Sequence, residues 1–261
     1  MQSKTDYEDT IMAMYVFEDE KRTKKLKVKD AIKRDKGIRY FCPNPRCNAR
    51  MFLWNVEGEK KSYFRASSNP KHTDHCPYGS DNSYNPNNIT EEGFVSDDVI
   101  ERMMLEREKQ QKHDNETNNQ GNGIQGETFP HTIQQVYDMC KAYPCNNEFN
   151  GQTIGQILID DRSIYMYPKG VFGYRLIEAR SRKLLYKDTS IFLETPIGDM
   201  RYQLELKYKK PQLFKEIREL LYNNRNHVIV VAGKWESSGK FNCFATKFNS
   251  KKQIKVLKRV I

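Results

Sequence analysis

The chain has 261 residues, of which 37% are apolar and 11% aromatic, and its formal net charge is +10. This apolar share can offset chain entropy in part of the chain, so a wholly disordered protein is excluded. The longest aliphatic stretch, residues 228–232, is far shorter than the roughly 20 residues that a membrane-spanning helix needs. The first residues lack the basic-then-apolar pattern of a signal peptide, and we therefore predict a soluble, cytoplasmic protein without a membrane partner.

The charge is unevenly distributed along the chain. Residues 1–78 have a net charge of +6, residues 79–128 of −7 and residues 129–261 of +11. Basic blocks attract polyanions, of which nucleic acid is the commonest, although charge alone fits a merely solvated surface equally well. The shifts in composition predict three parts: a module over 1–80, a linker over 81–128 and a domain over 129–261.

The first part is predicted to be a small β module. Aromatic-rich runs are separated by turn residues, which is typical of short strands. These runs cover residues 11–17, 37–42, 49–56 and 61–66, and the basic run Lys21–Lys36 lies between the first two.

Three cysteines and a histidine in this module have the spacing of a structural zinc site. Cys42 and Cys47 form a C-x4-C pair, and His72 and Cys76 follow as H-x3-C, with prolines around both pairs. Structural zinc takes four thiolate or imidazole ligands, and pairs on tight turns supply them readily. His75 is an alternative ligand, but it adjoins Cys76, and neighbouring residues rarely both reach one metal. The strands between the pairs would form the hairpin of a zinc-ribbon-like unit, and four protein ligands leave no position for a catalytic water.

The sequence around these ligands resembles a known bacterial zinc-binding region. The segment YFCPNPRCNARMFLW, followed by KKSYFRASSNPKHTDHCPY, is similar to the region that opens competence-associated CoiA-like proteins. The resemblance covers residues 37–78 and rests on the four ligands and a YFR strand before the H-x3-C pair. It implies a bacterial protein with a zinc region of a kind often paired with a nuclease domain, in a family thought to act on DNA.

The middle part is predicted to be an acidic, partly helical linker. A helix over 96–112 can be capped by Ser96, and Asp97 and Asp98 lie in its first turn, where the helix dipole favours anions. A polar, low-complexity tract over 114–126 follows and marks a domain boundary. The helix has a thin apolar stripe, so we expect it either to fray or to dock on a neighbour, including a protein partner.

The third part is predicted to be an OB-like β-barrel. A helix between the third and fourth strands of a small barrel is typical of the OB-fold. The expected elements are a helix over 131–143, strands over 153–159, 163–168, 173–186, 190–195 and 201–208, a helix from Pro211 to about residue 223 with apolar residues spaced three to four apart, and strands over 227–235, 240–248 and 253–261.

Basic and aromatic residues alternate along these strands. OB-folds commonly bind single-stranded nucleic acid in a basic groove whose aromatic side chains stack on bases. Neighbours on a strand point to opposite faces, so only about half of these residues can share a groove. The candidate nucleic-acid-binding residues are Tyr165, Tyr167, Tyr174, Arg175, Arg182, Tyr202, Lys207, Lys234, Trp235 and Phe241.

A metal-dependent DNA endonuclease is the alternative for this part. Glu205 and Lys207 have the E-x-K spacing of PD-(D/E)xK nucleases, in which the carboxylate holds Mg²⁺ and the lysine positions water. A second acidic ligand has to come from Asp188, Glu194 or Asp199, and no Pro-Asp pair precedes the strand. A protein-interaction adaptor is a third interpretation, since OB-folds also bind proteins.

We therefore predict a mainly β (α+β) protein that binds single-stranded nucleic acid without catalysis. Its structural Zn²⁺ module contributes basic surface through Lys21–Lys36 and Arg39, and the linker lets both domains engage one strand, which raises avidity. Substitution of Trp235 or Tyr174 by alanine is expected to weaken binding without unfolding the domain.

Overall fold

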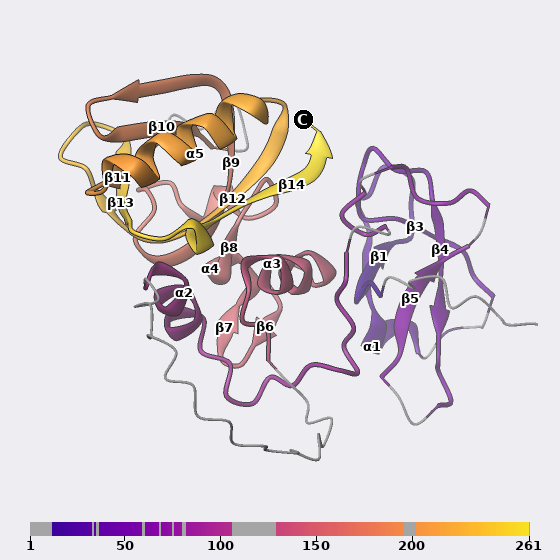
Figure 1. Ribbon diagram of the computed structural model, residues 1–261. Helices are drawn as coiled ribbons and strands as arrows, with labels where there is room; N and C mark the ends of the chain where they lie inside the picture. Colours follow the sequence, from indigo (N-terminus) through magenta and orange to yellow (C-terminus); the bar gives the residue numbers. More distant parts are fainter. Residues whose placement is uncertain are drawn as a thin grey trace, which may run out of the picture.

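Two β-sheets organise the protein. The computed structural model describes residues 12–32, 34, 37–58, 61–67, 69–74, 76–79, 82–105, 129–195 and 202–260. In this part the chain is mainly β, with one five-stranded sheet, one seven-stranded sheet and a small hairpin. Figure 1 shows the five-stranded sheet on one side of the molecule and the larger sheet, with its helices, on the other.

The five-stranded sheet forms the amino-terminal module. Its strands, in sheet order, are β2 (Lys25–Lys27), β1 (Tyr15–Phe17), β3 (Tyr40–Phe41), β4 (Arg50–Trp54) and β5 (Tyr63–Ala66), and the short helix α1 (Val28–Ala31) follows β2. Neighbouring strands are antiparallel, and a bridge from Ala13 to Phe64 joins the chain before β1 to β5. Each of the four runs predicted as strands contains one, because alternating residues such as Met51 and Phe64 are buried in the module core.

Five strands of the larger sheet close into a barrel. They are β9 (Gly173–Lys187), β10 (Ser190–Glu194), β11 (Gln203–Tyr208), β12 (His227–Ser237) and β13 (Cys243–Phe248). The pairs around the barrel are β9–β10, β10–β11, β11–β13, β13–β12 and β12–β9, and only β11–β13 is parallel. The closed barrel confirms the coarse prediction and is consistent with an OB-like arrangement.

Helix α5 (Pro211–Asn223) connects β11 to β12, at the place where the sequence predicts it. Pro211 occupies the first turn, where its missing N–H leaves no helical hydrogen bond unmade. Leu213, Ile217 and Leu221 follow at intervals of four residues and are buried in the barrel core. The apolar face of α5 therefore docks this helix on the barrel.

A layer of short elements packs against β9 and β12 outside the barrel. It comprises α2 (Ser96–Met104), α3 (Ile133–Ala142), the hairpin β6 (Glu148–Phe149) and β7 (Gln152–Thr153), α4 (Ile154–Ile157), β8 (Leu158–Ile159), and the carboxyl-terminal η2 (Lys251–Gln253) and β14 (Ile254–Val260). Ile100 of α2, Met139 of α3 and Val230 of β12 meet in one fully buried core. No helix in the described part of the chain is both long and apolar enough to cross a membrane.

Two strands predicted in this layer are wrong. Residues 153–159 comprise the end of β7, helix α4 and the two residues of β8, and residues 163–168 contain the 3-10 helix η1 (Ile164–Met166). The reason is a local turn, because the Asp160 carboxylate accepts the N–H of Arg162 and the Ser163 hydroxyl donates to the Leu158 carbonyl. The barrel strands accordingly span residues 173–248 rather than the whole of 129–261.

Candidate metal centre and nucleic-acid interface

Cys42, Cys47, His72 and Cys76 converge inside the amino-terminal module, as their spacing predicts. Their ligand atoms all lie within 4.8 Å of one another. Cys42 Sγ is 3.8 Å from Cys76 Sγ, and Cys47 Sγ is 3.3 Å from His72 Nδ1. Cys47 and Cys76 each end a tight turn, in which their N–H groups donate to the carbonyls of residues 44 and 73. The alternative ligand His75 lies outside the described residues.

The surrounding chain holds this cluster through its sulfurs and its turns. The backbone N–H of Asn44 donates to Cys42 Sγ and its side-chain amide to Cys76 Sγ, both at 3.4 Å. The Arg22 guanidinium donates to the carbonyls of Cys42 and Cys47, at 3.0 and 2.8 Å. Such outer contacts orient ligands around a metal in known sites.

The pKa shifts in the cluster reflect burial and the contacts among its own thiols and imidazole. Burial raises the pKa of the Cys42 thiol well above its usual value, whereas hydrogen bonds with Cys42 and Cys76 lower the pKa of Cys47. Burial alone would lower the pKa of His72, but hydrogen bonds to Cys47 and Cys76 outweigh it and raise this pKa to about 9. His72 Nε2 is buried and has no hydrogen-bond partner among the described residues. This set of soft donors could hold a metal ion.

The predicted nucleic-acid-binding residues divide between core and surface. Trp235 is only 2% exposed and Tyr202 only 9%, and both lie in the barrel core. Trp235 alternates with exposed Lys234 on β12, so its ring faces inward. Neither ring can stack on a base, which corrects the assignment of both residues and the expectation that Trp235→Ala leaves the domain folded.

Helix α2 contacts another group of these residues. The Tyr174 hydroxyl donates to Glu101 at 2.9 Å, and Arg175 lies 4.0 Å from Asp97. Lys234 packs over the Tyr174 ring, 5.2 Å from its centroid. The acidic helix thus offsets the positive charge here, and this part of the barrel offers little free surface to a polyanion.

The remaining candidates differ in their surroundings. The half-buried Tyr167 donates its hydroxyl to the Gly155 carbonyl at 2.7 Å. Tyr165 is 69% exposed but lies in η1, before the barrel strands. Lys207 and Phe241 are exposed, and the side chain of Arg182 lies outside the described residues.

Lys207 and Phe241 belong to a wider surface, the β10–β11 face, made of the outward residues of β9, β10, β11 and β13 and the β12–β13 loop. Cross-strand register places Lys187, Ser190, Lys207 and Lys247 in one row, and Leu185, Phe192 and Glu205 in the next. Lys240 Nζ from the loop lies 5.3 Å from the centroid of the Phe192 ring. The members that can contact a ligand are Leu185, Lys187, Phe192, Lys207, Lys240, Phe241 and Lys247.

Glu205 shares this face with Lys207, as the nuclease alternative requires, but it is enclosed. It is 5% exposed, accepts from the Ser190 hydroxyl at 2.8 Å and lies 3.8 Å from Lys240 Nζ. In the part of the chain that the structure describes, no group of three or more potential metal ligands includes Glu205. Asp199 is outside that part, and Asp188 and Glu194 join no such group.

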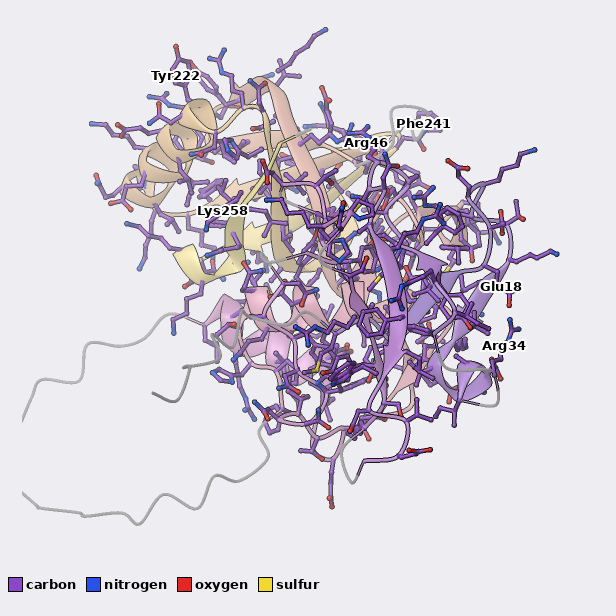
Figure 2. All side chains as sticks on the ribbon, turned by 90° about the vertical axis from the view of Figure 1, so that its right-hand side faces the viewer. Glu18, Arg34, Arg46, Tyr222, Phe241 and Lys258 are labelled. Atoms are coloured by element: carbon purple, nitrogen blue, oxygen red, sulfur yellow. The ribbon has the colours of Figure 1, made fainter. Side chains whose placement is uncertain are left out.

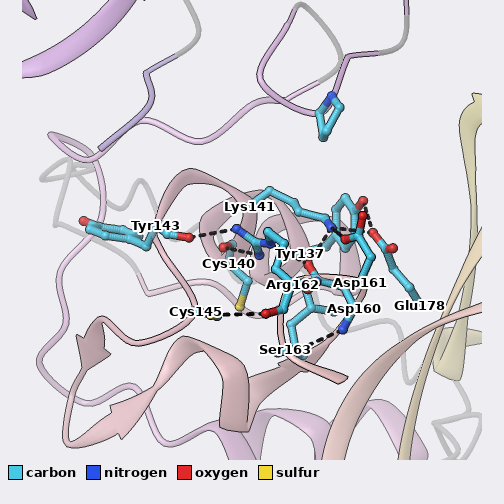
Figure 3. Close-up of polar contacts among 12 residues, drawn as sticks. Tyr137, Cys140, Lys141, Tyr143, Cys145, Asp160, Asp161, Arg162, Ser163 and Glu178 are labelled. Atoms are coloured by element: carbon cyan, nitrogen blue, oxygen red, sulfur yellow. Dashed lines mark hydrogen bonds and ion pairs between the residues drawn. The ribbon is translucent and has the colours of Figure 1, made fainter. Parts of the chain in front are cut away.

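The sequence did not predict a buried ion network centred on Lys141. Lys141 Nζ on α3 lies 2.5 Å from Asp160 and 2.7 Å from Glu178 of β9, and all three side chains are less than 5% exposed (Figure 3). Arg162 adds a second cation, 2.9 Å from Asp160, and the half-exposed carboxylate of Asp161 lies 3.8 Å from Lys141 Nζ. The only signal in the sequence was a lysine within the apolar residues of a predicted helix.

Arg162 also joins this network to the amino-terminal module. Its Nη1 donates to the hydroxyls of Tyr15 and Tyr78, at 3.3 and 3.4 Å. It also donates to the Tyr143 carbonyl at 2.9 Å (Figure 3). Tyr78 lies two residues after the ligand Cys76. A series of polar contacts therefore runs from Tyr78, close in the chain to the cysteine–histidine cluster, to the barrel strand β9.

Comparisons with known proteins return no relative. No family model matches the chain, and neither does any curated protein or solved structure. The assignment of a function therefore depends on the chemistry and placement of the residues themselves.

Proposed function

We propose that this protein binds single-stranded nucleic acid through the β10–β11 face of an OB-like barrel. The observation that carries the proposal is the position of Phe192, whose ring lies beside Lys240 on the outer face of the second barrel strand. OB-folds bind oligonucleotides on the face of their second and third strands and with the loop between the fourth and fifth. β10, β11 and the β12–β13 loop are the corresponding elements.

The side chains on this face match the two parts of a nucleotide. Lys187, Lys207 and Lys247 are exposed in one row across three strands and can follow a phosphate backbone. The rings of Phe192 and the 94% exposed Phe241 can stack on bases, at about 1–3 kcal/mol per base. Base stacking needs unpaired bases, so the face favours single strands over duplexes.

We also propose that the cysteine–histidine cluster holds Zn²⁺ in a structural role. Three thiolates and one imidazole form a common ligand set for structural zinc. When bound, the ion would fix the two turns that carry the ligands, and with them the sheet between the turns. Four protein ligands leave no coordination position for water or substrate, so the centre supports folding rather than catalysis.

Binding can be tested by fluorescence anisotropy with a labelled oligothymidylate of about 20 nucleotides, longer than the site of one OB-fold. We expect affinity to fall steeply between about 0.05 and 0.2 M salt. Lys207→Ala and Phe241→Ala should each weaken binding about tenfold, whereas Lys215→Ala on the exposed side of α5 should not.

The same titration separates binding from cleavage. Parallel samples with Mg²⁺ or a chelator are resolved on a denaturing gel. Intact oligonucleotide under both conditions supports the non-catalytic proposal. Mg²⁺-dependent cleavage that Glu205→Ala abolishes would establish the nuclease instead, and salt-independent affinity would remove the binding proposal.

A further inference from the structure

We infer that the amino-terminal module carries a second binding surface for single-stranded nucleic acid, separate from the barrel. This surface, the arginine–aromatic face, lies on the outer side of β3, β4 and β5 and includes the residue just before β3. Its members are Arg39, Phe41, Arg50, Phe52, Trp54 and Arg65. The inference shares its ligand class with the proposed function but stands on its own residues.

The alternation of β4 creates this face. Met51 and Leu53 point toward the module core, so the residues between them, Arg50, Phe52 and Trp54, point outward. Pairing with the neighbouring strands then places Phe41 directly opposite Arg50, and Arg65 directly opposite Phe52. An arginine and an aromatic ring thus meet on both sides of β4.

Each arginine packs against a ring. The guanidinium carbon of Arg50 lies 3.6 Å from the centroid of the Phe41 ring, that of Arg39 lies 4.6 Å from Phe52, and that of Arg65 lies 5.5 Å from Trp54. These contacts order the guanidinium groups before any ligand arrives.

Within the described part of the chain, the three guanidinium groups have no direct ion pair. Among the described residues, no carboxylate lies within ion-pair distance of Arg39, Arg50 or Arg65, although Arg34 nearby in the sequence pairs with Glu18. Trp54, at the end of β4, is 45% exposed. Large exposed apolar groups often mark interaction sites, and here one lies among cations.

Single-stranded nucleic acid fits this face better than other polyanions. A guanidinium that rests on a ring keeps its second planar face and its N–H edge free, and unpaired bases stack on arginine planes as well as on aromatic rings. The N–H edges can bind phosphate oxygens with charge-assisted hydrogen bonds. An acidic peptide would satisfy the charges but would leave the rings without stacking partners.

The face is also accessible. β1 lies toward the rest of the molecule, whereas β4 lies on the side of the module away from the barrel (Figure 1). In Figure 2 the module is nearest the viewer. Two residues of the face, Arg39 and Trp54, are exposed, and the other four are half-buried. A nucleic acid could therefore contact this face without displacing any described element.

The two tryptophans of the chain provide a direct test. Trp54 belongs to the arginine–aromatic face, whereas Trp235 is buried in the barrel. In the full-length Trp235→Phe variant, selectively excited tryptophan fluorescence reports on Trp54 alone. We expect oligothymidylate to quench this fluorescence. The double substitution Arg39→Ala and Arg65→Ala should lower the affinity measured by quenching about tenfold or more.

Two further variants separate stacking from charge and one site from the other. Arg39→Lys with Arg65→Lys retains the charge but loses the planar groups, so quenching should weaken at unchanged net charge. Lys240→Ala with Phe241→Ala disables the barrel loop, and Trp54 should still be quenched in that background. In the Trp54→Phe variant, the fluorescence of Trp235 should not respond.

The outcomes distinguish this inference from the proposed function. Anisotropy that shows binding while Trp54 fluorescence stays unchanged would overturn the inference and leave the barrel proposal intact. If oligothymidylate quenches Trp54 but the barrel variants leave the anisotropy titration unchanged, the inference is supported and the barrel proposal is not. Quenching by polyglutamate but not by oligothymidylate would assign the face to an acidic protein partner and overturn the inference.

Discussion

At the scale of single residues, burial decides which side chains can serve the proposed functions. The two tryptophans have the same chemistry but opposite surroundings, because strand alternation turns Trp235 inward and Trp54 outward. The alternating pattern predicted that only about half of the candidate residues can share a groove. It could not say which half, since the phase of alternation depends on which face of each strand the rest of the protein covers.

Substitution of each tryptophan by alanine should separate these roles. Trp235→Ala removes a fully enclosed ring from the barrel and is expected to lower the free energy of unfolding by about 3–5 kcal/mol. Trp54→Ala, on the exposed face, should lower it by less than about 1 kcal/mol. Urea titrations followed by circular dichroism measure both values. Equal losses would contradict the conclusion that Trp235 is buried and Trp54 is exposed.

The four ligand residues are the part of the site that sequence spacing predicts best, because their chemistry needs two pairs on turns. Cys47→Ala is expected to abolish metal binding and to destabilise the module by more than about 4 kcal/mol. The matched control is Cys145→Ala, another buried free cysteine outside the cluster. Metal analysis of the purified proteins should find one zinc per chain in the control and none in Cys47→Ala, and retained zinc in the latter would refute the ligand set.

At the scale of elements, local signals predicted some segments and tertiary contacts determined others. Helix α5 has a proline start and a regular apolar face, so its sequence specifies it. The α4–η1 segment has only short apolar runs, which periodicity cannot assign to helix or strand. The sequence also did not predict the junction of α3, β8 and β9. Lys141, Asp160 and Glu178 are distant in the sequence and meet only in the folded chain.

This junction makes stability depend on pH through Asp160. Burial alone would raise the pKa of its carboxyl group, but Arg162 and Lys141 outweigh that effect and hold the pKa below its usual range. The lowered pKa contributes stability that is present above the unfolded value of about 3.9 and is lost as pH falls toward the folded value. Asp160→Asn leaves Lys141 with fewer partners, and we expect a loss of about 3–5 kcal/mol at neutral pH.

The same variant should lose less on acidification, since this titrating group is gone. Urea titrations at neutral pH and near pH 3 measure the difference between the two proteins, with Asp74→Asn in an exposed turn as the control. A difference that stays constant with pH would show that folding does not shift the pKa of Asp160.

At the scale of the whole molecule, the module and the barrel are connected rather than independent. Arg162 contacts the hydroxyls of Tyr15 and Tyr78 from one side and Asp160 from the other, and the backbone N–H of Met14 donates to the Ala142 carbonyl on α3. The start of the predicted linker is also fixed, because Asn82 and Ser83 donate to Asp138 of α3. Charge blocks in the sequence predicted three parts, but they carry no information on such contacts.

Removal of the proposed zinc ion should therefore lower the thermal stability of the barrel as well as that of the module. With zinc bound, we expect thermal unfolding reported by Trp54 and by Trp235 to coincide, because the junction couples the two parts. A chelator frees the turn that ends at Cys76, and Tyr78, two residues later, loses its fixed position against Arg162. The Trp54 signal should then melt at a lower temperature than the Trp235 signal, and the barrel itself should lose a few degrees of thermal stability.

Single-tryptophan variants, Trp235→Phe and Trp54→Phe, report the two transitions separately. Arg162→Lys keeps the charge but loses the guanidinium fork, so it should separate the transitions even when zinc is bound. A Trp235 transition that is indifferent to both zinc and Arg162 would mean that the contacts at the junction carry no coupling between module and barrel.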